Sequence, residues 1–212
     1  MTASLHHRMY LLAHDEQARG PYDRSRTGLL VRAAALAELA LRGRLTETGG
    51  GSVTVAGTGS TGDPVLDEVL RQAPGHGWKQ LVRRDRGQTL AAVEDRLAAQ
   101  GLLTVEASRL RRGGRRVTVS DPAVLRAERE RMAAVLHGAT PVADIPAADA
   151  ALSALAAAGK VRSVVSRQDA RALRDRIDAC TGRLGTLAPG LEQAVRDLPT
   201  TMIAAQGGMG GS

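Results

Sequence analysis

The stretch LVRAAALAELALRGRL, residues 30–45, decides the fold. Its alanines and leucines favour helix, because these side chains lose little rotamer freedom there. Gly43 supplies the left-handed conformation in which many helices end, and Leu45 then begins a β-like segment. The same order recurs in EDRLAAQGLLTV (94–105) at Gly101 and in LSALAAAGKVRSVV (152–165) at Gly159. We therefore predict three helix–Gly–strand units, a weak internal repeat.

Hairpins are predicted in the first two units. Gly49–Gly51 lies between the β-like segments 44–48 and 52–56, and Gly113-Gly114 lies between 102–107 and 115–119. Glycine-rich turns between such segments are typical of hairpins. Asp-Pro pairs at 63–64 and 121–122 predict helix starts, because Pro suits the first helical position. Further helices are expected near 147–158, 167–180 and 189–197. The predicted fold class is mainly α, a single helical domain over 1–200 with short inserted β-hairpins and a disordered Gly-rich tail over 201–212.

The charge balance predicts binding to phosphates. The net charge is +7, and of 29 basic residues only Lys79 and Lys160 are lysines. Such a chain is attracted to nucleic acid or to anionic lipid. The preference for Arg, Ala and Gly over Lys is typical of a GC-rich bacterial genome, and we expect an actinobacterial source.

The remaining composition favours a cytosolic protein. Cys180 is the only cysteine, which fits a reducing compartment. No apolar run approaches the roughly 18 residues of a spanning helix, and the first residues lack the pattern of a signal peptide. We expect a cytoplasmic protein whose membrane contact is peripheral.

Signals for catalysis and cofactors are weak. GTGSTGD (57–63) lacks the lysine of a phosphate-binding P-loop. The five histidines are scattered along the sequence, and a single cysteine cannot complete a metal site. We expect no enzyme activity, no metal and no cofactor.

Three stretches carry a family resemblance: residues 30–45, TGDPVLDEVL (61–70) and VEDRLAAQGLLTVE (93–106). Their order and spacing resemble the Golgi phosphoprotein 3 family over roughly residues 8 to 197. The resemblance implies a helical domain with a hairpin edge. It also implies recognition of phosphatidylinositol 4-phosphate in a shallow basic pocket, without catalysis.

The resemblance also suggests site residues. The family pocket uses a Trp, an Arg on the first motif helix and two Arg on a later helix. Arg32 matches the first Arg, whereas the Trp position falls near Asp23 and the later Arg positions fall on Gly87 and Leu90. With the neighbouring basic cluster included, the candidate headgroup-binding residues are Arg32, Arg84, Arg86 and Trp78.

Each candidate has a structural alternative. Arg32 lies on an apolar helix face, where a guanidinium needs a partner. That partner is either a phosphate or, in a structural ion pair, Asp63 or Asp67. The cluster beside Trp78 either rims the headgroup pocket or is a solvated loop next to a core tryptophan; its members are Lys79, Arg83, Arg84 and Arg86.

Five arginines crowd the second hairpin: Arg109, Arg111, Arg112, Arg115 and Arg116. Near an anionic leaflet each contributes about 1 kcal/mol, which together gives only about millimolar affinity. Binding by several copies would raise the avidity, so a homo-oligomer is a companion hypothesis. The alternative is protection of an exposed strand edge.

The leading prediction is a peripheral adaptor that docks on an anionic phospholipid surface and engages a client protein. The second is a winged-helix-like DNA-binding protein, with helix 90–99 in the groove and the hairpin as wing. Glu94 and Asp95 make that helix a poor partner for phosphates, so nucleic acid is not expected. The third is a scaffold that binds acidic proteins.

Overall fold

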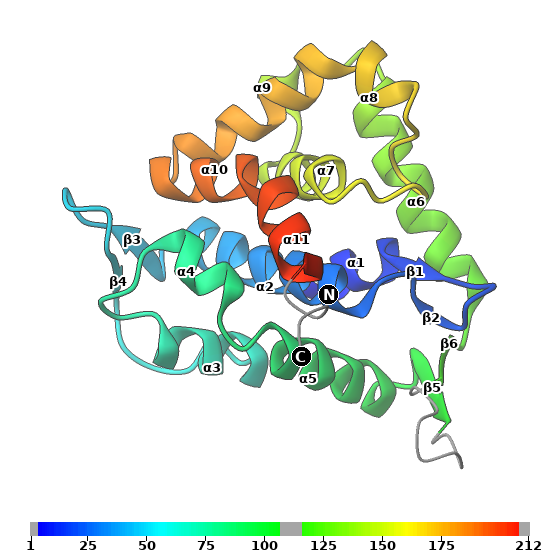
Figure 1. Cartoon of the computed structure of the whole chain (residues 1–212), viewed down its shortest axis with the longest axis horizontal. Helices are drawn as coiled ribbons and strands as arrows, with labels where there is room; N and C mark the ends of the chain where they lie inside the picture. Colours follow the sequence, from blue (N-terminus) through cyan, green and yellow to red (C-terminus); the bar gives the residue numbers. More distant parts are fainter. Residues whose placement is uncertain (1–3, 107–115, 208–212) are drawn as a thin grey trace.

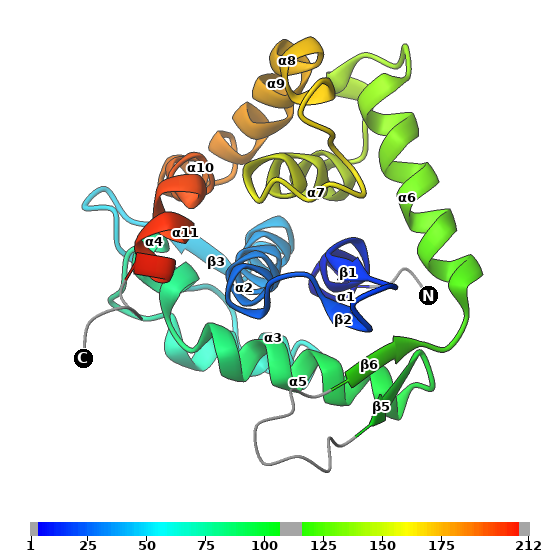
Figure 2. The ribbon, with the colours of Figure 1, turned by 45° about the vertical axis from the view of Figure 1, so that its right-hand side comes forward.

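Helix α2 (Arg24–Leu41) runs through the middle of the molecule. The computed structural model describes residues 4–106 and 116–207. Every residue of α2 from Thr27 to Ala40 is buried, including the polar ones. Figure 2 shows α2 nearly end-on, enclosed by α1 (Leu5–Leu12), α4 (Trp78–Arg83), α5 (Arg86–Ala99) and α7 (Ala147–Ala158). The Ala-rich sequence allows these neighbours to approach it closely.

The first two helix–Gly–strand units are confirmed. Gly43 and Gly101 adopt φ values of 65° and 73°. After each glycine the chain turns back, so that Arg44 N donates to Leu39 O and Leu102 N to Leu97 O, both at 2.9 Å or less. The helices therefore end where the glycines predict.

The prediction for the third unit, around Gly159, is wrong in two respects. Lys160, with φ of 51°, takes the left-handed position in place of Gly159, and no strand follows over 161–165. A Cβ on Gly159 would lie 2.5 Å from Cδ1 of Leu30. Gly159 therefore serves the close packing of α7 on α2 and not the helix end.

Both predicted hairpins form. Strand β3 (Leu45–Glu47) pairs antiparallel with β4 (Val53–Val55), and β5 (Leu103–Glu106) pairs with β6 (Arg116–Val119). A third small sheet joins β1 (His14–Asp15) to β2 (Gly20–Pro21), which the sequence did not predict.

The remaining helices complete a mainly α fold (Figure 1). Asp63 and Asp121 cap α3 (Pro64–Gln72) and α6 (Pro122–His137) with their side chains, as predicted. The helix expected over 167–180 is divided into α8 (Asp169–Ala172) and α9 (Arg174–Gly185). Helix α10 spans Pro189–Arg196, and a 3-10 turn, η1, spans Val142–Asp144. Helix α11 (Leu198–Gly207) occupies residues that we expected to belong to a disordered tail.

A candidate anionic-surface binding site

Arg32 is fully buried, with 0% of its surface exposed. Its Nε donates to Leu81 O at 3.1 Å, Nη1 to Thr89 Oγ1 at 3.1 Å, and Nη2 to Gln72 Oε1 at 2.7 Å. The guanidinium thus connects α2 to α3, α4 and α5. The prediction that Arg32 binds a headgroup directly is contradicted, because no solvent reaches it.

The alternative ion pair of Arg32 with Asp63 or Asp67 is also wrong. Asp67 accepts instead from Ser60 and from the amide of Thr61. Asp63 faces a histidine, as described below.

Arg32 is a buried cation held by neutral acceptors. Burial lowers the pKa of Arg32 to about 10, against the opposing influence of the negative charges on Asp85 and Glu68. Glu68 accepts from the amide of Gln72, whose oxygen in turn accepts from Arg32. Gln72 therefore links the buried guanidinium of Arg32 by two successive hydrogen bonds to the surface carboxylate of Glu68, whose negative charge stabilises it.

Trp78 is a core residue, 2% exposed. Its Nε1 donates to Oε2 of Glu47 at 3.2 Å, and the same oxygen accepts from the amide of Gly190 at 2.8 Å. The structural alternative is therefore correct for Trp78, and its prediction as a headgroup-binding residue is contradicted.

Arg84 and Asp85 form the turn between α4 and α5, and Arg86 is the first residue of α5. Asp85, between these two arginines, has a left-handed backbone with φ of 46°. Its carbonyl accepts from Thr89 Oγ1 at 3.1 Å, the same hydroxyl that contacts Arg32. Thr89 thus connects the buried guanidinium of Arg32 to the backbone of the turn that lies between Arg84 and Arg86.

Arg84 is exposed and lies between two neighbours. Its Nη1 is 2.8 Å from Nε2 of His76, and its Nε is 3.5 Å from Asp85. Nδ1 of His76 lies 2.9 Å from Pro74 O. Arg86 is half-buried. Lys79, from the same predicted cluster, pairs with Asp197 at 3.0 Å.

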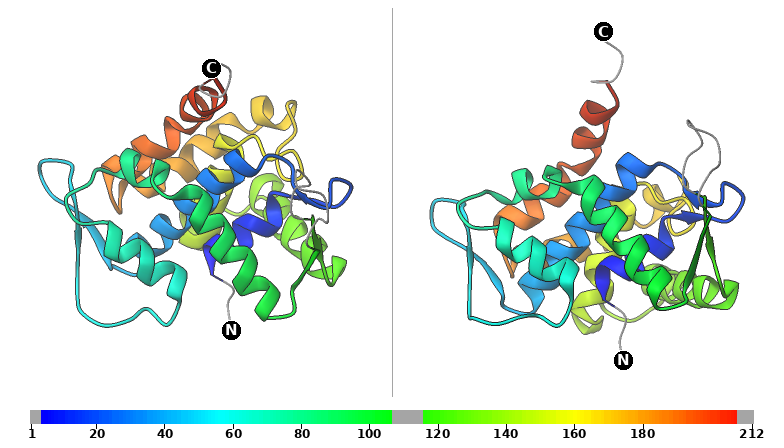
Figure 3. Two further views of the ribbon diagram at one scale, coloured as in Figure 1. Left: turned by 60° about the horizontal axis from the view of Figure 1, so that its bottom comes forward. Right: turned by 90° about the horizontal axis from the view of Figure 1, so that it is seen from below.

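Two further exposed arginines, Arg19 and Arg162, lie near the β1–β2 sheet. The α4–α5 turn, the start of α2 and the β1–β2 sheet follow one edge, the upper one in the right view of Figure 3. Tyr22, 67% exposed, lies 5.9 Å beneath the guanidinium of Arg162. Arg19, whose carbonyl accepts from Val117 N, is exposed next to β6.

Of the five arginines predicted on the second hairpin, the structure describes Arg116. Arg116 is exposed at the start of β6, opposite Glu106. The other four, Arg109, Arg111, Arg112 and Arg115, lie outside the described residues.

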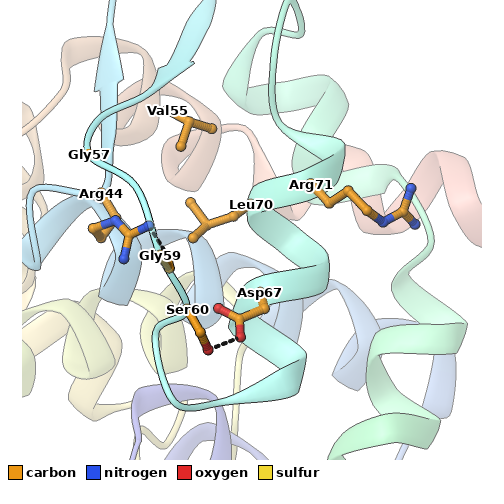
Figure 4. A pocket seen from close by; sticks show the side chains of 8 residues that line it. All are labelled: Arg44, Val55, Gly57, Gly59, Ser60, Asp67, Leu70 and Arg71. Carbon is orange, nitrogen blue, oxygen red and sulfur yellow. Dashed lines mark hydrogen bonds between the residues drawn. The ribbon is translucent and has the colours of Figure 1, made fainter.

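A depression lies between β4, the loop 57–60 and α3 (Figure 4). Arg44 points into it, but its Nε donates to Ala56 O at 3.1 Å and its Nη2 to Gly59 O at 2.7 Å. Arg71 pairs with Glu68. These guanidinium groups hold the loop and the helix, so this depression is a poor phosphate site.

Helix α5 does not present a DNA-reading face. Leu90, Val93 and Leu97 are buried in the core. The side exposed to solvent carries Gln88, Ala92 and Asp95 among its residues, whereas Arg96 is half-buried. This face is unsuited to a phosphate-lined groove.

A buried group of ionisable side chains joins the first two motifs. Nδ1 of His6 lies 3.3 Å from Oε2 of Glu38, and Nε2 lies 3.3 Å from Oδ2 of Asp63. Burial alone lowers the pKa of His6, but hydrogen bonds to Asp63 and Glu38 outweigh it and raise that pKa. The pKa of Asp63 is held far below its usual range by His6, although burial opposes this.

His7 lies beside His6, with 4.4 Å between ring centroids. The expectation that the histidines are too scattered for a metal site is wrong for this pair. One ligand atom each from His6, His7 and Asp63 lies within 4.8 Å of the others. In the sequence, two adjacent histidines on an apolar segment were the only indication of this group. Their approach to Asp63 depends on tertiary packing.

No helix among the described residues is both long enough and apolar enough to cross a bilayer. A family model described as Golgi phosphoprotein 3 (GPP34) matches residues 5–198. No curated protein matches the chain.

Proposed function

This chain belongs to the Golgi phosphoprotein 3 family, and from that premise we propose that it binds anionic phospholipid headgroups at a membrane surface. The preferred ligand in this proposal resembles phosphatidylinositol 4-phosphate, and the protein acts in the cytoplasm by binding and not by catalysis. The observation that carries the proposal is the α4–α5 connection, where Arg84 is exposed and Arg86 half-buried, and where the buried Arg32 holds Leu81 of α4 and Thr89 of α5.

Recognition proceeds in two steps. The cations of the chain first attract it to a negatively charged surface, over distances that salt shortens. A phosphate then takes hydrogen bonds from Arg84 and Arg86, because a guanidinium offers planar, paired donors. The guanidinium of Arg84 contacts His76 and Asp85 at the surface, so in this proposal it can turn toward a phosphate without breaking a contact in the core.

Arg32 acts in this proposal as a positioning residue. It holds the carbonyl of Leu81 at the end of α4 and the hydroxyl of Thr89 at the start of α5. The spacing of Arg84 and Arg86 depends on both attachments. This role differs from the direct contact that the family resemblance implies.

The affinity of one copy is expected to be low. The five hairpin arginines would contribute about 5 kcal/mol of unselective attraction, which corresponds to a dissociation constant near millimolar. Two linked copies, or a client protein already at the membrane, would raise the apparent affinity by about a hundredfold or more. We therefore include a homo-oligomer and a client protein in the proposal.

Vesicle flotation tests the function. The protein is mixed with vesicles of phosphatidylcholine alone, with phosphatidylserine, or with phosphatidylinositol 4-phosphate at equal total charge. The double variant Arg84→Ala/Arg86→Ala should lose its preference for the phosphoinositide vesicles. The matched control, Arg126→Ala/Arg174→Ala, removes two exposed charges from α6 and α9, away from the α4–α5 turn, and should keep that preference.

The outcomes separate the alternatives. A variant with all five hairpin arginines replaced should bind every anionic vesicle more weakly while its selectivity remains. Equal losses in the double variant and its control would refute headgroup recognition at the α4–α5 turn. Tighter binding to random duplex DNA than to any vesicle would favour the DNA-binding alternative.

A further inference from the structure

One imidazole nitrogen in the core, on His7, lacks a hydrogen-bond partner among the described residues. This atom, Nε2 of His7, is buried, whereas Nε2 of His6 faces Oδ2 of Asp63 at 3.3 Å. His6 is 0% and His7 5% exposed, so water does not satisfy them from outside. Buried polar atoms without partners are rare and need an explanation.

The third member of the group is a carboxylate. Oδ2 of Asp63 lies 3.3 Å from Nε2 of His6, and Asp63 is 7% exposed. Its other oxygen, Oδ1, accepts from the amide of Val65 at 2.9 Å and caps α3. Oδ2 is therefore directed toward the histidines by the geometry of the helix cap.

We propose that His6, His7 and Asp63 bind a divalent transition-metal ion, with Zn²⁺ as the best match. Two imidazoles and one carboxylate are donors that zinc prefers. The proposal concerns the interior of the molecule and is independent of the membrane-facing site.

The distances suit such an ion. In a tetrahedral site with bonds of about 2.0 Å, neighbouring ligand atoms lie about 3.3 Å apart. The separation of His6 Nε2 and Asp63 Oδ2 is already 3.3 Å, and all three ligand atoms lie within 4.8 Å of one another. The imidazole of His7 therefore has to approach by at most about 1.5 Å to complete the triangle. Oγ of Ser4, 3.5 Å from Asp63 Oδ2, or a water molecule can serve as fourth ligand.

Glu38 orients the first ligand. Its Oε2 faces Nδ1 of His6 at 3.3 Å and accepts from the amide of Leu5 at 2.8 Å, while Oε1 pairs with Arg42. A carboxylate on Nδ1 fixes the ring so that Nε2 is presented to the metal. The positive charge of the ion is then balanced by the carboxylates of Asp63 and Glu38.

The ion replaces a proton. In the metal-free protein the protonated ring of His6 faces Glu38 with Nδ1 and Asp63 with Nε2, and binding of Zn²⁺ to Nε2 releases the Nε2 proton to solvent. No bond other than this N–H breaks. Because the ligands are buried and come from α1 and from the start of α3, the ion is structural and joins these two elements around the end of α2.

Metal titration of the intact chain tests the proposal. Protein treated with a chelator and then dialysed is titrated with Zn²⁺ by calorimetry and with Co²⁺ by visible absorption. We expect one ion per chain, the intense d–d bands of a four-coordinate Co²⁺ site, and a higher melting temperature with Zn²⁺. His7→Gln should weaken binding by about a hundredfold or more, and Glu38→Gln by about ten- to a hundredfold through loss of orientation.

His137→Gln is the matched control, since it removes an exposed imidazole at the end of α6. This variant should bind Zn²⁺ like the wild type, and an equal loss in both histidine variants would overturn the site. If His7→Gln does not fold, the Zn²⁺ and Co²⁺ titrations of the wild-type protein test the site by themselves. A single ion with four-coordinate Co²⁺ bands supports the site, whereas no binding, or binding without these bands, refutes it.

Discussion

The guanidinium of Arg32 donates to the hydroxyl of Thr89, 3.1 Å away across the interface of α2 and α5. The same hydroxyl donates to the carbonyl of Asp85 at 3.1 Å. An arginine that matches a family motif is thus connected to the surface turn through one threonine. Through this connection a change at the buried Arg32 can alter the conformation of the surface turn.

Replacing Arg32 should destabilise the protein and loosen the turn. Arg32→Ala leaves a cavity and removes three hydrogen bonds, so we expect a loss of about 3 kcal/mol in the free energy of unfolding. Thr89→Val removes one of these acceptors at similar volume and should cost about 1 kcal/mol. Urea unfolding followed by circular dichroism measures both. An Arg32→Ala protein of unchanged stability that no longer selects phosphoinositide vesicles would instead identify Arg32 as a direct ligand.

Gly28 should be essential for the position of Arg86. A Cβ at Gly28 would lie 2.9 Å from the carbonyl oxygen of Arg86, which is backbone and cannot move aside alone. Gly28→Ala should therefore cost about 1–3 kcal/mol of stability and weaken headgroup selectivity.

Gly87→Ala is the matched control for that substitution, because no atom lies within 4 Å of the place that a methyl group on Gly87 would occupy. Here α5 should gain up to about 1 kcal/mol, since alanine favours helix over glycine. Thermal unfolding compares the two variants. A neutral Gly28→Ala would show that α2 and α5 separate easily.

His14 should make the protein less stable in mild acid. Burial lowers the pKa of His14 from its ordinary value of 6.5, and Arg129 acts in the same direction; Glu16, Asp15 and Glu94 oppose it. Below pH 6.5 the unfolded chain therefore binds a proton that the folded chain rejects, and the free energy of unfolding falls as the pH falls.

The variant His14→Gln isolates this contribution. It removes the titrating ring, so the stability difference between wild type and variant should shrink as the pH falls below 6.5. Urea unfolding at several pH values measures the difference. A constant difference across that range would mean that His14 is protonated alike in both states.

Membrane binding should depend on salt. The screening length falls from about 10 Å at 0.1 M salt to about 3 Å at 1 M, so attraction between the basic surface and anionic vesicles weakens. Flotation with phosphatidylserine vesicles should decrease steeply over this range. Arg84→Ala/Arg86→Ala should show a shallower decrease, because fewer charges are screened. Salt-independent flotation would indicate insertion of apolar residues in place of charge attraction.

Much of the fold could be predicted because local signals mark its boundaries. Asp63 and Asp121 cap helices whose first residue is proline, and Gly43 ends α2. Helix α4 was missed because Gly77, which precedes it, offers no capping side chain. Gly159 was wrongly predicted to end a helix. A glycine is needed there because Leu30 packs against it, a contact that exists only in the tertiary structure.

The candidate site could be predicted only in outline. The sequence identified Arg84 and Arg86 as part of a basic cluster beside Trp78, and Arg32 as a match to the family pocket. Whether Arg32 faces solvent depends on α3, α4 and α5, which pack over it from later in the chain. His6 and Asp63 are far apart in sequence, so no spacing rule could join them.

The enclosure of α2 also has a consequence for synthesis. Helix α2 forms early in translation, yet its partner α7 begins only at Ala147. Until then one flank of an Ala- and Leu-rich helix is open to water and to other nascent chains. The ribosome-bound intermediate is therefore a natural client for chaperones, and the length of the delay is set by the order of helices along the gene.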